Sequence, residues 1–353
     1  MQATTFHVAT TGSDANNGSA GAPWLTIGKC VSAMQGGDTC LVHAGTYAES
    51  TLYLPNGTSG APTTLQANPG DTVTINSPSR TNDCMICFHL GAQWQVVDGF
   101  ILDGLAITKF IVNTDDNSKS DFHHLTIQNC EMRNSLYSGM LISGDNWKVL
   151  GNNIHHNGTD ATLDHGIYFS ASQSLIQNNT VHNNKCYNIQ NYNNWGLDIS
   201  NNTYDRNTFY NSGCGLVLVQ GGSHTVTNNV QHDDATFGPG GAPGGEPTLW
   251  CCGPGSKVSN NTLVHNFTGG IISKGEDSGD TVTNNISCEN TGGADLDMPN
   301  STQSGNRTGT CPAFVDRANN DYRLASGDTS VGANLAPGSP TGAVTTPVTQ
   351  GPY

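Results

Sequence analysis

The chain of 353 residues carries 13 Lys and Arg against 28 Asp and Glu, giving a formal net charge of −15, and only 12% of its residues are charged. This acidic balance, without a basic stripe, excludes a general nucleic-acid-binding protein. The 43 glycines, with abundant Asn, Thr and Ser, are typical of turn-rich β structure and disfavour a helical protein. No apolar run is long enough to span a membrane, and we expect residues 1–4 to mark the start of a mature secreted protein.

A repeat of about 25 residues runs through the middle of the chain. Each copy has an aliphatic or β-branched residue, one further residue and then an asparagine. The intervals between the marked asparagines are 23, 26, 23, 27, 32 and 24 residues. Asparagine tolerates the left-handed backbone that a tight corner needs, and stacked amides can hydrogen-bond as a ladder. The marked residues are Asn129, Asn152, Asn178, Asn201, Asn228, Asn260 and Asn284.

A short strand of alternating polarity follows these turns, which predicts a parallel sheet built from successive coils. The sequence therefore predicts an all-β fold, a right-handed parallel β-helix of about ten coils. We expect one domain over residues 1–325, followed by a C-terminal tail (326–353) that packs on the solenoid. The side chains expected to fill the core are Met140, Ile142, Ile167, Phe169, Ile189, Leu216, Leu218, Leu249 and Ile271.

The alternate positions of the same strands are expected to face outward as a strip of aromatic and polar groups. Such a strip suits an extended polymer, because aromatic rings stack against the apolar faces of sugars. The alternative is an ordinary surface under loops. The residues predicted to bind substrate are Asn188, Gln190, Tyr192, Trp250 and Ser170.

Three residues on or beside this strip are candidates for catalysis. His165 and Tyr168 begin one strand and can move protons. Lys274 is one of only 13 cationic residues and would suit β-elimination as a base or as a group that neutralises a carboxylate. A structural histidine and a plain surface lysine are the alternatives.

Acidic residues gather at the expected coil edges. Asp116, Asp145 and Asp164 are predicted to hold Ca²⁺, which prefers oxygen ligands. The same carboxylates, with Glu276, could instead supply the acid and base of a glycoside hydrolase. The third interpretation is that these carboxylates are ordinary solvated charges on loops.

Eleven cysteines indicate an oxidising compartment. We predict the pairs Cys30–Cys40, Cys186–Cys214 and Cys288–Cys311, and the odd count leaves at least one free thiol. The adjacent residues Cys251 and Cys252 are expected not to bond to each other.

Both ends of the chain resemble those of one group of proteins. Residues 11–14 (Thr-Gly-Ser-Asp), 36–43 (Gly-Gly-Asp-Thr-Cys-Leu-Val-His) and 44–47 (Ala-Gly-Thr-Tyr) are similar to the cap and first coil of the pectate-lyase-like right-handed parallel β-helix superfamily. Residues 311–325, with Phe-Val-Asp and Asp-Tyr-Arg-Leu, resemble its closing coil. The resemblance implies an N-terminal cap over about residues 1–50 and an activity on polysaccharides.

Together these observations predict a secreted polysaccharide-degrading enzyme, leaning to a lyase that cleaves a uronate-containing polymer by β-elimination. Two alternatives stay open, a glycoside hydrolase with an Asp/Glu pair and a non-catalytic carbohydrate-binding solenoid. The expected partner is a polysaccharide, with no nucleic acid and no membrane, and we expect a monomer.

Overall fold

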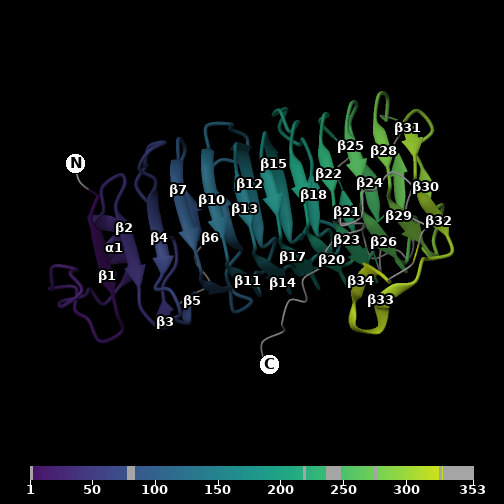
Figure 1. Cartoon of the computed structure of the whole chain (residues 1–353). Coiled ribbons are helices and arrows are strands. Elements are labelled where there is room, and N and C mark those ends of the chain that lie inside the picture. Colours follow the sequence, from purple (N-terminus) through teal and green to yellow (C-terminus); the bar gives the residue numbers. More distant parts are fainter. Residues whose placement is uncertain are drawn as a thin grey trace.

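The structure, a computed structural model, describes residues 3–77, 84–217, 220–235, 248–273, 275, 277–325 and 328. In this part of the chain nearly all regular structure is β-strand, and from β6 onward each turn of the chain lays one strand on each of three faces (Figure 1). Successive coils pair in parallel and in register. The predicted right-handed parallel β-helix is confirmed.

The three faces are numbered in the order in which each coil crosses them. Face 1 consists of β6 (Cys84–Phe88), β9 (Phe110–Thr114), β12 (Met140–Asp145), β15 (Ile167–Ser172), β18 (Ile189–Asn191), β21 (Leu216–Val217), β24 (Leu249–Cys251), β27 (Ile271–Ser273) and β30 (Leu296–Asp297). Face 2 consists of β1 (Thr5–Val8), β2 (Thr39–Val42), β4 (Thr63–Ala67), β7 (Gln93–Asp98), β10 (His123–Gln128), β13 (Lys148–Leu150), β16 (Leu175–Gln177), β19 (Thr203–Asp205), β22 (Thr225–Thr227), β25 (Lys257–Ser259), β28 (Thr281–Thr283) and β31 (Thr302–Ser304). Face 3 is an 11-stranded sheet, consistent with the predicted number of about ten coils. It consists of β3 (Gly45–Ala48), β5 (Val73–Asn76), β8 (Ile101–Asp103), β11 (Glu131–Arg133), β14 (Asn153–His155), β17 (Thr180–His182), β20 (Thr208–Tyr210), β23 (Val230–His232), β26 (Thr262–Val264), β29 (Ile286–Cys288) and β32 (Arg307–Gly309).

From β7 onward, the corner between faces 2 and 3 is the same two-residue connection in every coil. Its first residue has a positive φ, as predicted for Asn129, Asn178, Asn228, Asn260 and Asn284. The remaining two assignments are wrong. Gly151, with φ 63°, takes the corner position given to Asn152, and Arg206, with φ 55°, takes the one given to Asn201. Asn201 also has a positive φ of 61°, but it precedes β19 and turns the chain between faces 1 and 2.

From Asn152 onward, the second residue of this corner builds a buried amide ladder. Asn179 is 1% exposed, and its Oδ1 accepts the backbone N–H of Asn152 at 2.9 Å. Its Nδ2 donates to the carbonyl of Val149 at 2.8 Å. The marked corner asparagines were expected to form the ladder, but Asn178 is exposed, because its left-handed backbone turns the side chain outward. The ladder runs through Asn152, Asn179, Asn207, Asn229, Asn261, Asn285 and Asn306.

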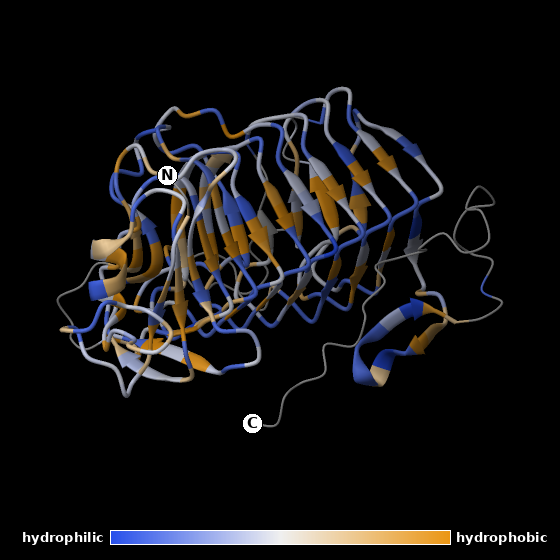
Figure 2. Cartoon of the chain, turned by 60° about the vertical axis from the view of Figure 1, so that its left-hand side comes forward, coloured by the Kyte–Doolittle hydropathy of each residue, from blue (hydrophilic) through white to orange (hydrophobic). Residues whose placement is uncertain are grey.

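The core lies inside the coils, as the alternation of the strands predicts. Hydrophobic and hydrophilic stretches recur at equivalent places in successive coils (Figure 2). Leu218 lies outside the described residues, as does the side chain of Leu216. The other predicted core residues are all at most 2% exposed: Met140, Ile142, Ile167, Phe169, Ile189, Leu249 and Ile271.

Five disulfides hold neighbouring segments together. The three predicted pairs, Cys30–Cys40, Cys186–Cys214 and Cys288–Cys311, are confirmed, and a fourth joins Cys84 to Cys87. The expectation that Cys251 and Cys252 stay apart is wrong, because these neighbours form the fifth bridge at the end of β24. The free cysteine expected from the odd count is Cys130, which is buried.

The two ends of the described chain differ in how they finish. At the N-terminal end, α1 (Ile27–Ala33) packs over the first coil (Figure 1), with Thr26 as its N-cap. Residues 311–325 do not form the expected closing coil. β33 (Phe314–Asp316), the 3₁₀ turn η2 (Arg317–Asn319) and β34 (Asp321–Leu324) make an antiparallel hairpin, because Asn320 at φ 60° reverses the chain.

The hairpin covers the outside of face 3. Tyr322 is 2% exposed and packs with Val264 and Cys288. The predicted tail, residues 326–353, lies outside the described residues except for Asp328. No helix among the described residues is long and apolar enough to cross a membrane.

Candidate functional site

Loops of variable length border face 1 on both sides. The connection from face 3 to face 1 ranges from five residues between β20 and β21 to sixteen between β23 and β24. The connection from face 1 to face 2 ranges from two residues between β12 and β13 to eleven between β18 and β19. Functional residues concentrate on such loops around a regular scaffold. Face 1 is therefore the candidate functional surface.

Alternate positions of the face 1 strands align in one continuous row along the solenoid, and at Val217 only the backbone is described. Strand pairing aligns Leu141 with Tyr168, Tyr168 with Gln190 and, through β21, Gln190 with Trp250. The bridge between Leu52 and Ile86 places residue 53 at the head of this row. The full row is Tyr53, Cys87, Asn113, Leu141, Tyr168, Gln190, Val217, Trp250, Ile272 and Asp297.

An aromatic cluster surrounds Tyr168 in the middle of the row. The ring of Tyr168 lies 5.6 Å from that of Trp195, in the long loop between β18 and β19, and 5.6 Å from that of His165. Trp195 is 36% exposed. Tyr192 and Trp250 pack against a buried group formed by Tyr187 and the Cys186–Cys214 disulfide. The predicted aromatic strip thus exists and spans several coils.

His165 lies beneath this cluster and not at its surface. It is 1% exposed, and its Nδ1 accepts the backbone N–H of Tyr187 at 3.4 Å. Burial lowers the pKa of His165 to about 3, partly offset by a hydrogen bond that the ring donates to the Gln190 side chain. The expectation of an accessible proton-transfer group at this position is wrong in its placement, because the ring is packed under Tyr168. His165 instead holds Gln190 and Tyr168 in place.

Tyr168 is half-buried on the outer side of β15. Burial raises the pKa of its phenol to about 12, helped by the neighbouring Tyr192. At neutral pH the hydroxyl therefore stays protonated and acts as a hydrogen-bond donor.

Asn188 and Ser170 were predicted to face outward, and both are fully buried. The Nδ2 of Asn188 donates to Asp234 Oδ2 at 2.5 Å, and the Oδ1 of Asn188 accepts the hydroxyl of Ser212 at 2.7 Å. Ser170 donates to the carbonyl of Tyr192 at 2.8 Å. Asn188, just before β18, binds the carboxylate of Asp234, which lies 46 residues later in the chain. Asn188 and Ser170 therefore stabilise the loops beside face 1 and do not face a substrate.

Asp234, the acceptor for Asn188, is itself buried in this network. It accepts the backbone N–H of Ser212 and an N–H of Gln231, at 2.8 and 2.7 Å. Burial raises its pKa to about 7, against these hydrogen bonds.

The predicted metal ligands do not converge. Asp145 ends β12, whereas Asp164 precedes β15 at the opposite edge of face 1, and Asp164 accepts the N–H groups of Thr159 and Asp160. Asp116 accepts from Ser118 within its own loop. Over the described ranges no group of three or more His, Cys, Asp or Glu side chains is placed to hold a metal. These three carboxylates therefore do not fit one shared calcium site, and calcium stays a prediction.

Two further predicted residues, Lys274 and Glu276, lie outside the described residues. In the sequence, Lys274 directly follows β27, the strand that contributes Ile272 to the row. Its catalytic role stays a prediction.

The sequence interpretation missed the N-terminal part of the row, where Tyr53 meets His89 and Asp115. The marked asparagines begin only at Asn129, so the earlier coils were not aligned. The short apolar runs at residues 84–88 and 110–112, followed closely by His89 and Asp115, were the available signal.

A family model described as a right-handed β-helix region matches residues 111–242. The crystal structure of a pectate lyase, Pel9A, matches with a TM-score of 0.71, over 97% of this chain and 96% of its own, at 16% identity. These two matches show that the chain has the right-handed parallel β-helix fold, which it shares with this pectate lyase.

Other solved members of the β-helix group have the same architecture. A rhamnogalacturonan lyase matches with a TM-score of 0.54 and 15% identity, over 86% of this chain and 87% of its own. An alginate lyase from Paenibacillus sp. str. FPU-7 matches with a TM-score of 0.52 and 10% identity, over 87% and 98%. At these identities the likeness establishes the shared fold. No curated protein is similar to the chain in sequence.

Proposed function

We propose that this β-helix binds an extended polysaccharide along face 1 and cleaves a uronate-containing polymer by β-elimination. The observation that carries the proposal is the single in-register row, which brings Tyr168, Gln190 and Trp250 onto one surface between variable loops. A linear polymer can contact such a row in consecutive coils about 4.8 Å apart. Flat aromatic rings supply stacking surface for sugars.

The structurally similar proteins support the same substrate class. They include a pectate lyase, a rhamnogalacturonan lyase and an alginate lyase. A structure named simply as a glycoside hydrolase matches over 92% of this chain with a TM-score of 0.53. The first group favours elimination, and the last keeps hydrolysis as the alternative.

Elimination needs a base for the C5 proton, a donor for the leaving oxygen and a group that offsets the uronate carboxylate. The C5–H bond breaks, its electron pair forms the C4–C5 double bond, the C4–O bond breaks, and the leaving oxygen takes a proton. We assign the donor to Tyr168, whose raised pKa keeps it protonated. Lys274 follows β27, which lies four coils from β15, so we assign it to offsetting the carboxylate of a uronate residue farther along the polymer, and the base is a group nearer Tyr168. Gln190 lies next to Tyr168 in the row and would offer its amide to the substrate, while His165 positions both.

Hydrolysis of a neutral polymer is favoured by a different observation. None of the ten residues in the row is Lys or Arg, and the chain carries a net charge of −15. A uronate polymer therefore needs cations from the bordering loops or a bound metal. The acid and base of a hydrolase would come from Glu276 with a second carboxylate.

Mass spectrometry of the products from a panel of uronate and neutral polysaccharides, with calcium or with chelator, tests the proposal. We expect unsaturated oligosaccharides from a uronate polymer. Products that have gained water would establish hydrolysis instead, and no product from any polymer would leave a binding solenoid.

Replacing Trp250 by alanine should raise KM about three- to tenfold, because it removes one stacking surface worth about 0.5–1.5 kcal/mol. kcat should change little, since Trp250 lies two strands beyond Gln190 in the row. Steady-state kinetics on the responsive polymer check this, with Leu90→Ala as a control, because that exposed residue is outside the row. An unchanged KM would argue against binding along face 1.

We further propose that the protein is secreted and acts as a monomer. Five disulfides support an oxidising compartment.

A further inference from the structure

A second polar cluster lies at the head of the face 1 row, at the N-terminal end of the solenoid. Tyr53 aligns with Cys87 and Asn113, because Leu52 bridges Ile86 and β6 pairs with β9. Two residues beyond Cys87 and Asn113, the chain places His89 and Asp115 in neighbouring coils. The backbone N–H of Asp115 donates to the carbonyl of Phe88 at 2.9 Å, which fixes this approach.

The three side chains of this cluster orient one another. The rings of Tyr53 and His89 stack with centroids 3.5 Å apart and planes 2° from parallel. Asp115 accepts the Tyr53 hydroxyl at 2.9 Å through Oδ1 and meets His89 Nδ1 at 2.6 Å through Oδ2. A carboxylate can only accept, so the Nδ1 of His89 carries the proton in this contact.

The consequence is an oriented acceptor at the surface. In the neutral ring, a proton on Nδ1 leaves Nε2 as the acceptor. The side chain of His89 is 65% exposed, so the ring is largely open to solvent. The contact of Nδ1 with Asp115 and the stacking of Tyr53 fix the orientation of the ring, and therefore the direction in which Nε2 points.

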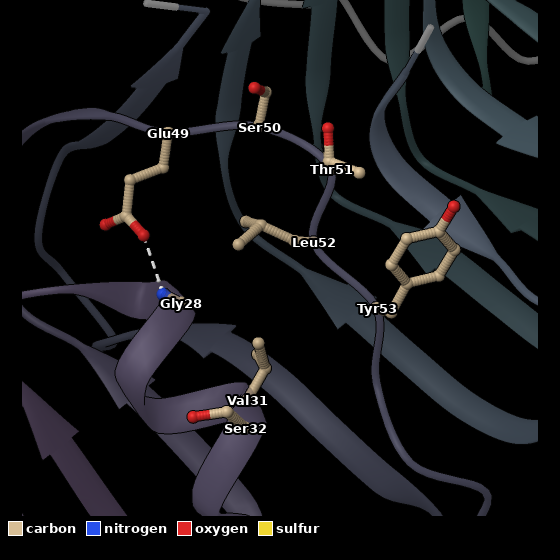
Figure 3. Close-up of a pocket in the computed structure, with 8 residues that line it drawn as sticks. All are labelled: Gly28, Val31, Ser32, Glu49, Ser50, Thr51, Leu52 and Tyr53. Atoms are coloured by element: carbon tan, nitrogen blue, oxygen red, sulfur yellow. Dashed lines mark hydrogen bonds between the residues drawn. The ribbon is translucent and has the colours of Figure 1, made fainter. Parts of the chain in front are cut away.

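A pocket adjoins the cluster and shares Tyr53 with it. It lies between α1 and residues 49–53 (Figure 3). Val31 and Leu52 give it an apolar surface, and Ser32, Ser50 and Thr51 add hydroxyl groups. Glu49, at the far side from Tyr53, points to the backbone N–H of Gly28 at 2.6 Å and is engaged there.

We infer that Tyr53, His89 and Asp115, with this pocket, form a remote subsite that binds the ring hydroxyls of a sugar residue. The inference rests on the proposed function, since it takes the polymer to lie along face 1. A sugar hydroxyl donates to His89 Nε2 and the sugar's apolar face covers Val31 and Leu52. No Lys, Arg or His is among the eight residues that line the pocket, so hydroxyl groups and not a carboxylate are recognised.

This subsite is separate from the aromatic cluster. Four coils separate Tyr53 from Tyr168 in the row, a distance of about 19 Å at about 4.8 Å per coil. A short oligosaccharide bound at Tyr168 does not reach His89, whereas a long one does. The subsite therefore adds affinity for long chains without taking part in cleavage.

The variant His89→Ala tests the subsite, with His265→Ala as a matched control. His265 Nδ1 lies 2.6 Å from Asp233 Oδ1 and its side chain is 50% exposed, but it follows β26 on face 3. The probes are a long and a short oligogalacturonide and a long xylo-oligosaccharide. Affinity is measured by calorimetry at low temperature, and the imidazole signals of the two histidines are followed by NMR.

We expect a long probe to shift the signals of His89 and not those of His265. His89→Ala should weaken the long probe by about three- to tenfold, the size of one lost hydrogen bond, and leave the short one unchanged. Equal affinity for His89→Ala and the parent, an equal loss in His265→Ala, or no binding of either long probe would overturn the inference. Cleavage of a polymer without a response at His89 removes the subsite alone, whereas a response at His89 without cleavage supports the subsite and removes the proposed lyase activity.

Discussion

Replacing Asn179 by alanine should lower the free energy of unfolding by about 3–5 kcal/mol. The change leaves the backbone N–H and Nδ2 of Asn152 and the carbonyl of Val149 without their partner in a buried corner. Each buried polar group left unpaired costs about 1–3 kcal/mol. Urea unfolding with the disulfides intact measures the loss.

The neighbouring variant Asn178→Gly is the matched control. Asn178 is exposed and has φ 57°, a conformation that glycine adopts without steric cost. Its free energy of unfolding should stay within about 1 kcal/mol of the parent. If Asn179→Ala cost no more than Asn178→Gly, the ladder would not stabilise the coil.

His165 should make the fold sensitive to acid. Burial lowers its pKa from 6.5 to about 3, so the folded state favours the neutral ring. The stabilisation is complete above pH 6.5 and is lost as pH falls from 6.5 toward 3. Each pH unit inside this window costs about 1.4 kcal/mol, or about 3 kcal/mol by about pH 4.5. His182, with a pKa lowered by burial to about 4, adds a loss of the same sign.

Two buried carboxyl groups act in the opposite direction. Burial raises the pKa of Asp234 from 3.8 to about 7 and that of Asp280 to about 6. Each protonated carboxyl group therefore stabilises the fold fully below pH 3.8, and this stabilisation is lost as the pH rises through the raised pKa. The comparison of His165→Gln with the parent separates the histidine, because both proteins keep these carboxyl groups. The slope of unfolding free energy against pH, from urea titrations between about pH 4 and pH 7, should be smaller by about 1.4 kcal/mol per unit in the variant. Identical slopes would show that His165 does not titrate in this way.

The sequence predicts the coil well at positions where a single local requirement, such as burial or a left-handed backbone, determines the residue type. Ile167 and Phe169 alternate with Tyr168, and this alternation alone places the first two in the core. Asn178 lies at a corner because few residues other than glycine and asparagine adopt its backbone. The same reasoning fails at Asn201, since residues 199–202 and 176–179 have the same pattern but turn the chain at different corners.

The candidate site is harder to predict, because its side chains are fixed by distant partners. Asn188 has an outward position by alternation, yet Asp234, 46 residues later, draws it into the protein. His165 is buried because Tyr168 and Tyr187 cover it. Tyr53, His89 and Asp115 come from three coils, and only the strand register shows that they meet.

The uniform corner between faces 2 and 3 makes the coil an exchangeable unit. The ladder asparagine of each coil offers the same donors and acceptors to the next coil. Asn179, for example, donates to Asn207 Oδ1, and Asn207 donates in turn to the carbonyl of Ile176. A duplicated coil, such as residues 152–178, would therefore find matching partners above and below. Gene duplication or design could lengthen face 1 in steps of about 4.8 Å. The length of polymer that the surface accommodates would change by whole coils, independently of the loops that determine which polymer is bound.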